Sequence, residues 1–314
     1  MTKLTVLSLA RLGPPEIQTR LDAEFDCRLV GRDGDLDALI EAIGSEVTAL
    51  ATTGGRGASA ELIARLPKLQ TIACYGVGVD AIDVEAARRY GVAVTNTPDV
   101  LTDDVADMAV LLFGMQLRQL VRGDAWVRSG DWERHGSMAL GRTLRGRTVG
   151  VLGFGRIGQA VARRLAVSGA QVLYHKRTPL DDAAWPYAAS PRELAERSDD
   201  LILCCSGGPA THHLVDAEVL AALGPGGVLV NIARGSVVDE TALIAALEQS
   251  TIAGAALDVF ADEPRVPAAL TQRDDVVLSP HAASATQETR MAMGDLVLQN
   301  LHAHAAGRPL LTPV

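Results

Sequence analysis

The sequence lacks an excess of basic residues. Its 29 lysines and arginines stand against 38 aspartates and glutamates, which gives a net charge of −9 over 314 residues. Nucleic acids and anionic membrane surfaces attract proteins chiefly through basic patches. We therefore expect neither a nucleic acid nor a membrane as the main partner of this chain.

Long apolar runs are also missing. No run approaches the roughly 18 apolar residues that a transmembrane helix requires. The short apolar run within residues 1–10 is followed closely by charge and by Pro14, which is not typical of a signal peptide. The chain is nevertheless 48% hydrophobic and can bury a sizeable core. These features predict a soluble protein of the cytoplasm.

Cysteine is scarce. The four cysteines are Cys27, Cys74, Cys204 and Cys205. They show no C-x-x-C spacing, and the adjacent pair is poorly placed to form an ordinary disulfide. Reduced thiols are the simplest interpretation, and the sequence predicts no metal site.

The most informative stretch reads T-V-G-V-L-G-F-G-R-I-G and covers residues 148–158. Gly153, Gly155 and Gly158 stand at G-x-G-x-x-G spacing after a β-branched, apolar run. In dinucleotide-binding folds the first glycine permits a tight turn, the second lets the backbone approach a pyrophosphate, and the third lets the helix pack closely. Free N–H groups at the helix start also attract phosphate. Taken alone, the pattern fits a purely structural glycine turn equally well.

Short apolar runs alternate with helical patterns along the whole chain, which predicts an α/β protein with two doubly wound parallel-sheet domains. A length of 314 residues fits two domains. The predicted strands cover residues 3–9, 27–30, 47–51, 71–75 and 93–95, then 148–152, 171–175, 200–205, 227–232, 253–258 and 276–279. We place the first domain at residues 1–98 and 287–314, and the dinucleotide-binding domain at residues 99–286.

A long helix and an irregular segment precede the glycine pattern. Thr102, followed by two aspartates, predicts the start of a helix that runs through Leu120. Residues 126–145 have no strong periodicity and carry Trp132. They fit either an arm that packs on a partner subunit or a local loop with a small core of its own.

A basic turn follows the second strand of the dinucleotide-binding domain. NAD-specific folds place an acidic residue about 20 positions after the glycines, where it binds the adenosine ribose. Here the sequence reads His175-Lys176-Arg177-Thr178 and contains no carboxylate. An arginine fork binds phosphate strongly and directionally. The turn therefore favours NADP(H), with these residues around the 2′-phosphate, over the alternative of a solvated basic turn.

Three polar clusters lie at the ends of later strands, at residues 231–235, 258–264 and 279–281. Ligand sites of open α/β sheets lie at this edge. Arg234 can hold the carboxylate of a 2-keto acid and polarise its carbonyl. His281 can donate the proton that accompanies hydride addition, and Glu263 beside it favours the protonated imidazole. Asp258 is placed to accept a hydrogen bond from the nicotinamide amide.

These motifs resemble the D-isomer-specific 2-hydroxyacid dehydrogenase family. The resemblance rests on G-F-G-R-I-G, N-I-A-R-G-S-V-V-D-E, L-D-V-F-A-D-E-P and S-P-H, which begin at residues 153, 231, 257 and 279. It implies two Rossmann-like domains around a cleft, with catalytic Arg234, Glu263 and His281. It also implies that the N–H groups of Val77 and Gly78 bind the substrate carboxylate, together with Arg234. The cofactor-binding positions are then Phe154, Gly155, Arg156, Ile157, His175, Lys176, Arg177, Thr178, Cys205, Ile232, Ala233, Arg234 and Asp258.

Further stretches resemble one branch of this family. Residues 96–107, the turn at 175–178 and the ending R-P-L-L-T-P-V look like NADPH-dependent glyoxylate/hydroxypyruvate reductases. The resemblance implies a homodimer that reduces small 2-keto acids to D-2-hydroxy acids. Hydroxyphenylpyruvate or 2-ketogluconate reduction is an alternative, and a corepressor-like, nucleotide-sensing binding protein is a rival of another class. Two departures stand out: C-S-G-G-P from residue 205, where relatives usually have C-P-L-T-P, and Ala282-Ala283, where glycines are common.

Overall fold

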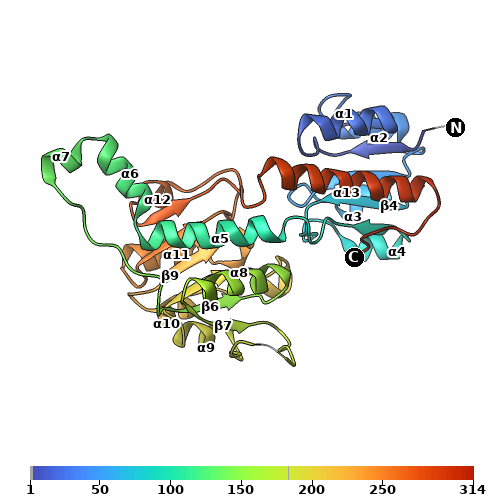
Figure 1. The fold of residues 1–314 in the computed structure, drawn as a ribbon. Helices are drawn as coiled ribbons and strands as arrows, with labels where there is room; N and C mark the ends of the chain where they lie inside the picture. The colour runs from blue at the N-terminus through green and yellow to red at the C-terminus, as the bar shows by residue number, and fades with distance from the viewer. Residues whose placement is uncertain (1–2, 183) are drawn as a thin grey trace. The chain divides into compact units, whose positions relative to one another are not determined.

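The computed structural model describes residues 3–182 and 184–314. The chain divides into two compact units, one formed by the residues up to Leu101 with Ala285–Val314 and the other by Thr102–Ser284 (Figure 1). The boundaries that we placed at residues 98/99 and 286/287 lie within three residues of these limits. Both units are α/β structures built on parallel sheets, so the predicted fold class is confirmed.

The first unit contains a five-stranded parallel sheet in the order β2-β1-β3-β4-β5. Its strands are β1 (Thr5–Ser8), β2 (Asp26–Leu29), β3 (Ala49–Thr53), β4 (Thr71–Tyr75) and β5 (Ala93–Thr95). Its helices are α1 (Pro15–Glu24), α2 (Leu36–Ile43), α3 (Ala60–Ala64), α4 (Val84–Arg89) and α13 (Gln287–Ala305). The C-terminal segment returns to this sheet, where Pro313 pairs with Thr95 at the end of β5.

The second unit contains a six-stranded sheet in the order β11-β10-β9-β8-β6-β7, and every paired strand is parallel. Its strands are β6 (Thr148–Leu152), β7 (Gln171–His175), β8 (Asp200–Leu203), β9 (Val228–Asn231), β10 (Gly254–Leu257) and β11 (Val276–Leu278). Its helices are α5 (Thr102–Leu117), α6 (Leu120–Arg128), α7 (Asp131–His135), α8 (Arg156–Val167), α9 (Pro191–Glu196), α10 (Ala217–Leu223), α11 (Glu240–Glu248) and α12 (Ala268–Thr271), with short 3₁₀ turns η1 (Pro209–Thr211) and η2 (Gly235–Val237).

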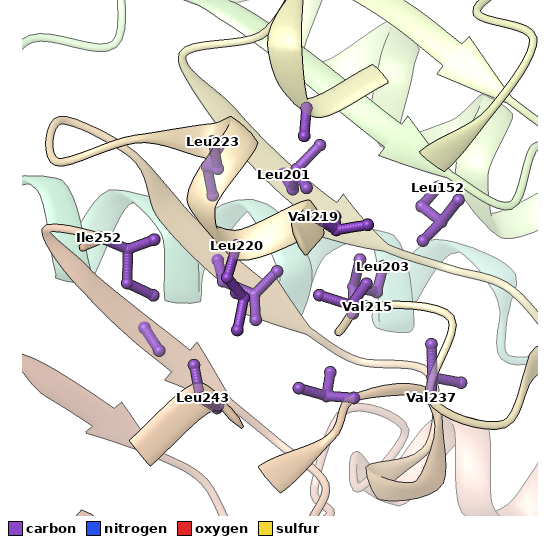
Figure 2. Close-up of a cluster of buried hydrophobic side chains, with 14 of the residues drawn as sticks. Leu152, Leu201, Leu203, Val215, Val219, Leu220, Leu223, Val237, Leu243 and Ile252 are labelled. Atoms are coloured by element: carbon purple, nitrogen blue, oxygen red, sulfur yellow. The ribbon is translucent and has the colours of Figure 1, made fainter. Parts of the chain in front are cut away.

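Helices cover the second sheet on both faces. Helices α9, α10 and α11 contact one another in sequence, and α5 contacts α8. Figure 2 shows Val219, Leu220 and Leu223 of α10 packed with leucines of β8. Because both faces are covered, every residue of β8 is buried, as a parallel sheet between two helical layers requires.

The segment before β6 differs from the prediction in two respects. The long helix ends at Leu117 rather than Leu120, because Gln119 has a left-handed φ of +51° that interrupts it. The segment expected to be irregular, residues 126–145, contains the last three residues of α6 and the whole of α7, and these two short helices extend away from the sheet of their unit (Figure 1). Among the described residues, no helix is long and apolar enough to cross a membrane.

The order of the strands fixes where a ligand site is expected. In the second sheet, β6 lies between β7 and β8, so the chain reverses its direction of travel across the sheet at β6. Open α/β sheets bind ligands beyond the carboxyl ends of the strands at such a switch point. The glycine turn follows β6, and Cys205 lies just after β8.

Candidate active site

The glycine turn after β6 contains one glycine that faces open space and two that are tightly enclosed. A Cβ on Gly153 would lie 2.3 Å from the amide nitrogen of Cys205, and one on Gly158 would lie 2.1 Å from the carbonyl oxygen of Gly153. Close packing therefore demands glycine at both positions. A Cβ on Gly155 would meet nothing within 4 Å. The backbone at Gly155 is thus left accessible to a ligand.

The start of α8 fits a bound pyrophosphate. Helices α9, α10 and α11 are capped by the side chains of Ser190, Asp216 and Asp239, which accept hydrogen bonds from N–H groups of the first turn. Helix α8 begins after Gly155 and has no side-chain cap. Among residues 3–182 and 184–314, no side chain caps the first turn of α8, and the positive end of such a helix attracts an anion.

The residues around Gly155 contribute in different ways. Phe154 is 1% exposed as a whole residue, and its ring stacks on the Tyr174 ring with centroids 4.1 Å apart. This burial includes the main chain, so Phe154 presents almost no surface of its own to a ligand. Arg156 is exposed and Ile157 is half-buried on the first turn of α8. The roles of Phe154, Arg156 and Ile157 in binding a dinucleotide stay predictions.

The basic turn after β7 presents exposed cationic and hydroxyl groups. Arg177 and Thr178 are exposed and Lys176 is half-buried. Within residues 3–182 and 184–314, no carboxylate pairs with Arg177 or Lys176. The His175 imidazole is engaged through Nδ1, which lies 2.8 Å from the carbonyl oxygen of Ala188. The turn is therefore suited to a phosphate ligand, with His175 serving to shape it.

Tyr187 is a residue of this turn that the sequence did not predict. Its hydroxyl donates a hydrogen bond of 3.2 Å to the carbonyl oxygen of Lys176, and its ring stacks near that of His175. A bridge between Tyr187 and Tyr174 brings this segment alongside β7. No local sequence pattern links Tyr187 to residues this far away along the chain. Its support of the basic turn is therefore visible only in the folded structure.

The loop after β9 is closed by Asn231 and carries Arg234. The Asn231 side chain donates to the carbonyl oxygen of Arg234 at 2.9 Å and accepts from the N–H of Ala233 at 3.0 Å. A strand-ending asparagine followed by small residues is the signal of such a turn, although we had assigned Asn231 no role. Ile232 and Ala233 are buried within it. Arg234 is half-buried and its Nη1 donates to the carbonyl oxygen of Ala233.

Gly235 lets this loop pack directly on the loop after β10. A Cβ at Gly235 would lie 1.9 Å from the carbonyl oxygen of Phe260. The backbone of residues 231–235 therefore lies against that of residues 258–263. This close approach brings the positive charge of Arg234 near enough to lower the pKa of Glu263.

His281 and Glu263 form an ion pair across two loops. The Nδ1 atom of His281 lies 2.7 Å from Oε2 of Glu263, whose Oε1 accepts the N–H of Phe260 at 3.1 Å. The His281 side chain is 44% exposed. No partner for its Nε2 is found in the described part of the chain. The pair therefore fixes one ring nitrogen and leaves the other available to a substrate.

The backbone of His281 is held in an unusual conformation. Its φ is +52°, a left-handed value that costs a residue with a side chain about 1–3 kcal/mol. The His281 N–H donates to the carbonyl oxygen of Asp258 at 2.8 Å, which helps to impose this conformation. Strained residues of this kind gather at functional sites.

Asp258 organises the loop that carries His281. Its carboxylate is buried and accepts hydrogen bonds from the Ser279 hydroxyl at 2.5 Å, the Ala282 N–H at 2.7 Å and the Ala283 N–H at 3.0 Å. Ala282 and Ala283 thus act through their main chain, which glycines would also supply. A carboxylate has about four lone-pair positions, so the hydrogen bond to a nicotinamide amide stays a prediction beside this structural role.

The electrostatics of Glu263 favour its charged form. Partial burial opposes ionisation, but the hydrogen bond and charge of His281, the Phe260 N–H and the charge of Arg234 together outweigh it. The pKa of Glu263 therefore lies below its usual value. An ionised Glu263 can only accept a hydrogen bond, so Nδ1 of His281 donates to it and the imidazole ring is oriented.

The loop after β8 carries the cysteine and glycine departures. Burial raises the pKa of the Cys205 thiol to about 11, so this side chain is a neutral group at pH 7. Gly208 has a φ of +127°, which side-chain-bearing residues rarely adopt, and it leads into η1. The predicted contact of Cys205 with a cofactor stays a prediction.

Val77 and Gly78 lie in the first unit, in the loop after β4. Both residues are half-buried. In the described ranges neither of their N–H groups has an acceptor, whereas the carbonyl oxygens of Gly76 and Val77 do have donors. Successive N–H groups can together bind an anion, and the role of these two in binding the substrate carboxylate stays a prediction.

A sheet whose switch point carries an open glycine turn, together with a histidine–carboxylate pair and an arginine at the same edge, defines a dinucleotide-dependent oxidoreductase. The family model described as "D-isomer specific 2-hydroxyacid dehydrogenase, NAD binding domain" matches residues 110–283. The chain belongs to the D-isomer-specific 2-hydroxyacid dehydrogenase family. The predicted family and the predicted use of a nicotinamide dinucleotide are thereby confirmed.

Relatives with named activities match over most of their length. Glyoxylate/hydroxypyruvate reductase A of Arabidopsis thaliana is 43% identical over 298 residues, with 95% of each chain covered. Hydroxyphenylpyruvate reductase of Plectranthus scutellarioides is 46% identical over 268 residues, with 85% of each chain covered. The structure of an NADPH-dependent glyoxylate/hydroxypyruvate reductase from Sinorhizobium meliloti in complex with NADP and malonate matches with a TM-score of 0.94, at 43% identity, and covers 100% of this chain and 97% of that one.

Proposed function

We propose that the protein is an NADPH-dependent reductase of small 2-keto acids, with glyoxylate and hydroxypyruvate as leading substrates and D-2-hydroxy acids as products. The observation that carries the proposal is the 2.7 Å pair of His281 and Glu263, with Arg234 on the neighbouring loop. The similarity to two glyoxylate/hydroxypyruvate reductases supports the choice of substrates.

The chain supplies the proton and the charges. Arg234 holds the substrate carboxylate and polarises the carbonyl, which directs negative charge onto the carbonyl oxygen. Because Glu263 keeps a proton on Nδ1 of His281, Nε2 is the atom that gives its proton to that oxygen. The nicotinamide cofactor supplies the hydride. The N–H groups of Val77 and Gly78 receive the substrate carboxylate.

The preference for NADPH is assigned to the basic turn. Arg177, Lys176 and Thr178 lie at the end of β7, where an NAD-specific fold would place a carboxylate. Arg177 has no acidic partner in the described ranges, so its guanidinium can form a bidentate bond with a 2′-phosphate. The S. meliloti relative, which was solved with NADP, supports this assignment.

The test is a steady-state panel. Oxidation of NADPH and NADH is measured with glyoxylate, hydroxypyruvate, hydroxyphenylpyruvate and 2-ketogluconate, and we expect the highest kcat/KM for glyoxylate or hydroxypyruvate with NADPH. Absence of turnover with every keto acid, in protein that binds NADPH, would overturn the enzymatic proposal. A higher kcat/KM for hydroxyphenylpyruvate would favour the second candidate, which the 46% identity to hydroxyphenylpyruvate reductase supports.

We also propose that the enzyme is a homodimer that pairs through α6, α7 and the segment that follows them. Neither helix contains a buried residue. Leu120, Trp132 and Leu140 of this arm are 57%, 61% and 94% exposed, which is costly for a free surface. Sedimentation velocity should give a dimer for the native chain and a monomer for Leu140→Ser with Trp132→Ser. A native monomer at micromolar concentration would contradict the proposal.

A further inference from the structure

Three successive carbonyls of the loop after β4, those of Gly76, Val77 and Gly78, accept hydrogen bonds from the protein. The carbonyl oxygen of Gly76 accepts the N–H of Thr97 at 2.9 Å, and that of Val77 accepts Nδ2 of Asn96 at 2.9 Å. The Cys74 thiol donates to the carbonyl oxygen of Gly78 at 3.7 Å. The loop is therefore fixed from its carbonyl side.

Because the carbonyls of Gly76 and Val77 are held, the geometry of the peptide bond also fixes the directions of the Val77 and Gly78 N–H groups. In a planar trans peptide, the carbonyl oxygen of one residue and the N–H of the next point in opposite directions. Holding the carbonyls of Gly76 and Val77 toward Asn96 and Thr97 thus turns the N–H groups of Val77 and Gly78 away from them together. Both N–H groups are consequently oriented before any ligand arrives.

Asn96, which donates to this loop, is itself hydrogen-bonded to the C-terminal segment. The Thr312 hydroxyl donates a hydrogen bond of 2.6 Å to the carbonyl oxygen of Asn96. The same hydroxyl accepts Nδ2 of Asn300, a buried residue of α13, at 3.0 Å. Asn300 also accepts the N–H groups of Leu311 and Thr312 through Oδ1. Residues 311 and 312 are therefore locked to α13 by one buried amide.

Three of these hydrogen bonds run head to tail. Asn300 donates to the Thr312 hydroxyl, which donates to the peptide between Asn96 and Thr97. The N–H of that peptide donates to the peptide between Gly76 and Val77, whose own N–H has no acceptor among residues 3–182 and 184–314. Hydrogen bonds arranged head to tail polarise one another. The free N–H of Val77 is the donor end of this chain.

We propose that Thr312 and Asn300 are positioning residues that act through Asn96, and that they orient and polarise the Val77 and Gly78 N–H groups for a substrate carboxylate. The C-terminal segment is then part of the apparatus for carboxylate binding, although it touches no substrate. The proposal rests on the proposed function only in that the bound carboxylate belongs to a 2-keto acid.

Substitutions at Thr312 separate this role from a purely structural one. Thr312→Val removes the hydroxyl and Thr312→Ser keeps it. Thr48→Val is the matched control, because Thr48 lies in the same unit and its buried hydroxyl has no hydrogen-bond partner within the described part of the chain. Loss of one hydrogen bond should raise the KM for glyoxylate about three- to tenfold in Thr312→Val. We expect kcat and the Kd for NADPH to change less than twofold, and Thr312→Ser to restore the KM.

A binding measurement keeps the inference independent of turnover. Oxalate, a carboxylate that accepts no hydride, is titrated into the full-length protein while the amide resonances of Val77 and Gly78 are followed by NMR. Both resonances should move in the native chain, and Thr312→Val should weaken the Kd for oxalate by the same factor as the KM. If Thr312→Val does not fold, Asn96→Ala serves instead, since it removes the donor to Val77.

The outcomes are distinct. Equal oxalate affinity in the native chain, Thr312→Val and Thr48→Val would overturn the inference, as would oxalate binding without movement of the two amides. Absence of turnover together with the expected oxalate behaviour would refute the proposed reaction and leave the inference in place. A lower melting temperature in Thr312→Val with unchanged oxalate affinity would make Thr312 a structural residue only.

Discussion

The two units share the beginning of one strand order but offer different groups after their first strands. In both sheets the first strand lies between the second and the third. In the second unit this strand leads into an uncapped helix behind Gly155, which faces open space. In the first unit it leads to Pro14 and Pro15 at the start of α1. Pro15 has no N–H to offer an anion.

Side-chain packing increases the contrast. A Cβ on Gly13, just before α1, would lie 2.7 Å from the Tyr75 hydroxyl, which itself donates to the carbonyl oxygen of Arg290. The space that remains open at Gly155 is therefore filled by tyrosine at Gly13. Both sheets have a switch point, but of the two loops only the one after β6 is free of proline and of covering side chains, which supports the proposed phosphate site.

The loops after the fourth strand of each unit, β4 and β9, also differ in the groups that they offer. After β4 the first unit offers main-chain donors, the N–H groups of Val77 and Gly78. After β9 the second unit offers a charged side chain, Arg234, on a turn closed by Asn231. In our proposal, the corresponding loops of the two units serve an anion in different ways, one through the backbone and the other through a side chain.

The largest expected effect is a loss of kcat, and it should distinguish two histidine–glutamate pairs, one in each unit. His281→Ala should lower kcat by about 100-fold or more, because a positioned proton donor is lost. His302 makes a similar pair with Glu24, at 2.6 Å, in the first unit. His302→Ala should leave kcat within twofold of the native value. Near-normal turnover by His281→Ala would show that His281 is not the proton donor and that the two pairs do not differ in this respect.

A comparison of two glycines tests the difference in phosphate binding. Gly155→Val should weaken NADPH binding by about tenfold or more, since a side chain in the ligand space costs about 1–3 kcal/mol. Gly155 has a φ of −81°, so this variant is expected to fold. Gly13→Ala should lower the melting temperature, because φ is +59° and Tyr75 is in the way, without changing the Kd for NADPH. Fluorescence titration and thermal melting measure both; equal NADPH affinity of Gly155→Val and native protein would refute the assignment.

A substitution in the basic turn tests whether the second unit recognises the 2′-phosphate of NADPH. Arg177→Ala should raise the Kd for NADPH about tenfold, which corresponds to one lost charge-assisted hydrogen bond, and should leave the Kd for NADH nearly unchanged. Arg32→Ala is a suitable control because Arg32 pairs with Asp22 in the first unit. Equal weakening of both cofactors in Arg177→Ala would mean that the turn does not read the 2′-phosphate.

The smallest expected effect is the pH dependence of stability at Glu263. The pKa of this group is lowered in the folded chain, so its contribution is complete above the unfolded pKa of about 4.3 and is lost as the pH falls through the folded value. The difference in melting temperature between native protein and Glu263→Gln should therefore be constant from pH 8 to about pH 5 and shrink below that. Glu46→Gln, at an exposed turn, is the control. A difference that grows on acidification would contradict the sign of the shift.

Local patterns predicted the parts of the molecule that depend on neighbours in sequence. The buried strand before Gly153, the glycine spacing and the clusters containing Arg234, Glu263 and His281 are contiguous, and each was recognised from a few residues. The support for these groups was not recognised, because it comes from distant positions. The hydrogen bond of Tyr187 to the basic turn spans more than ten residues. The hydrogen bond of Thr312 to Asn96 spans more than 200 residues.

The sequence by itself determined the fold class, the family and the turn where a dinucleotide phosphate is expected, because backbone periodicity and glycine spacing are local properties. The tertiary structure alone decided which glycine stays open, how Asp258 holds His281 in a left-handed conformation, and where the Val77 and Gly78 N–H groups point. These properties depend on atoms brought together by folding: the amide of Cys205, the N–H groups of Ala282 and Ala283, and the hydroxyl of Thr312.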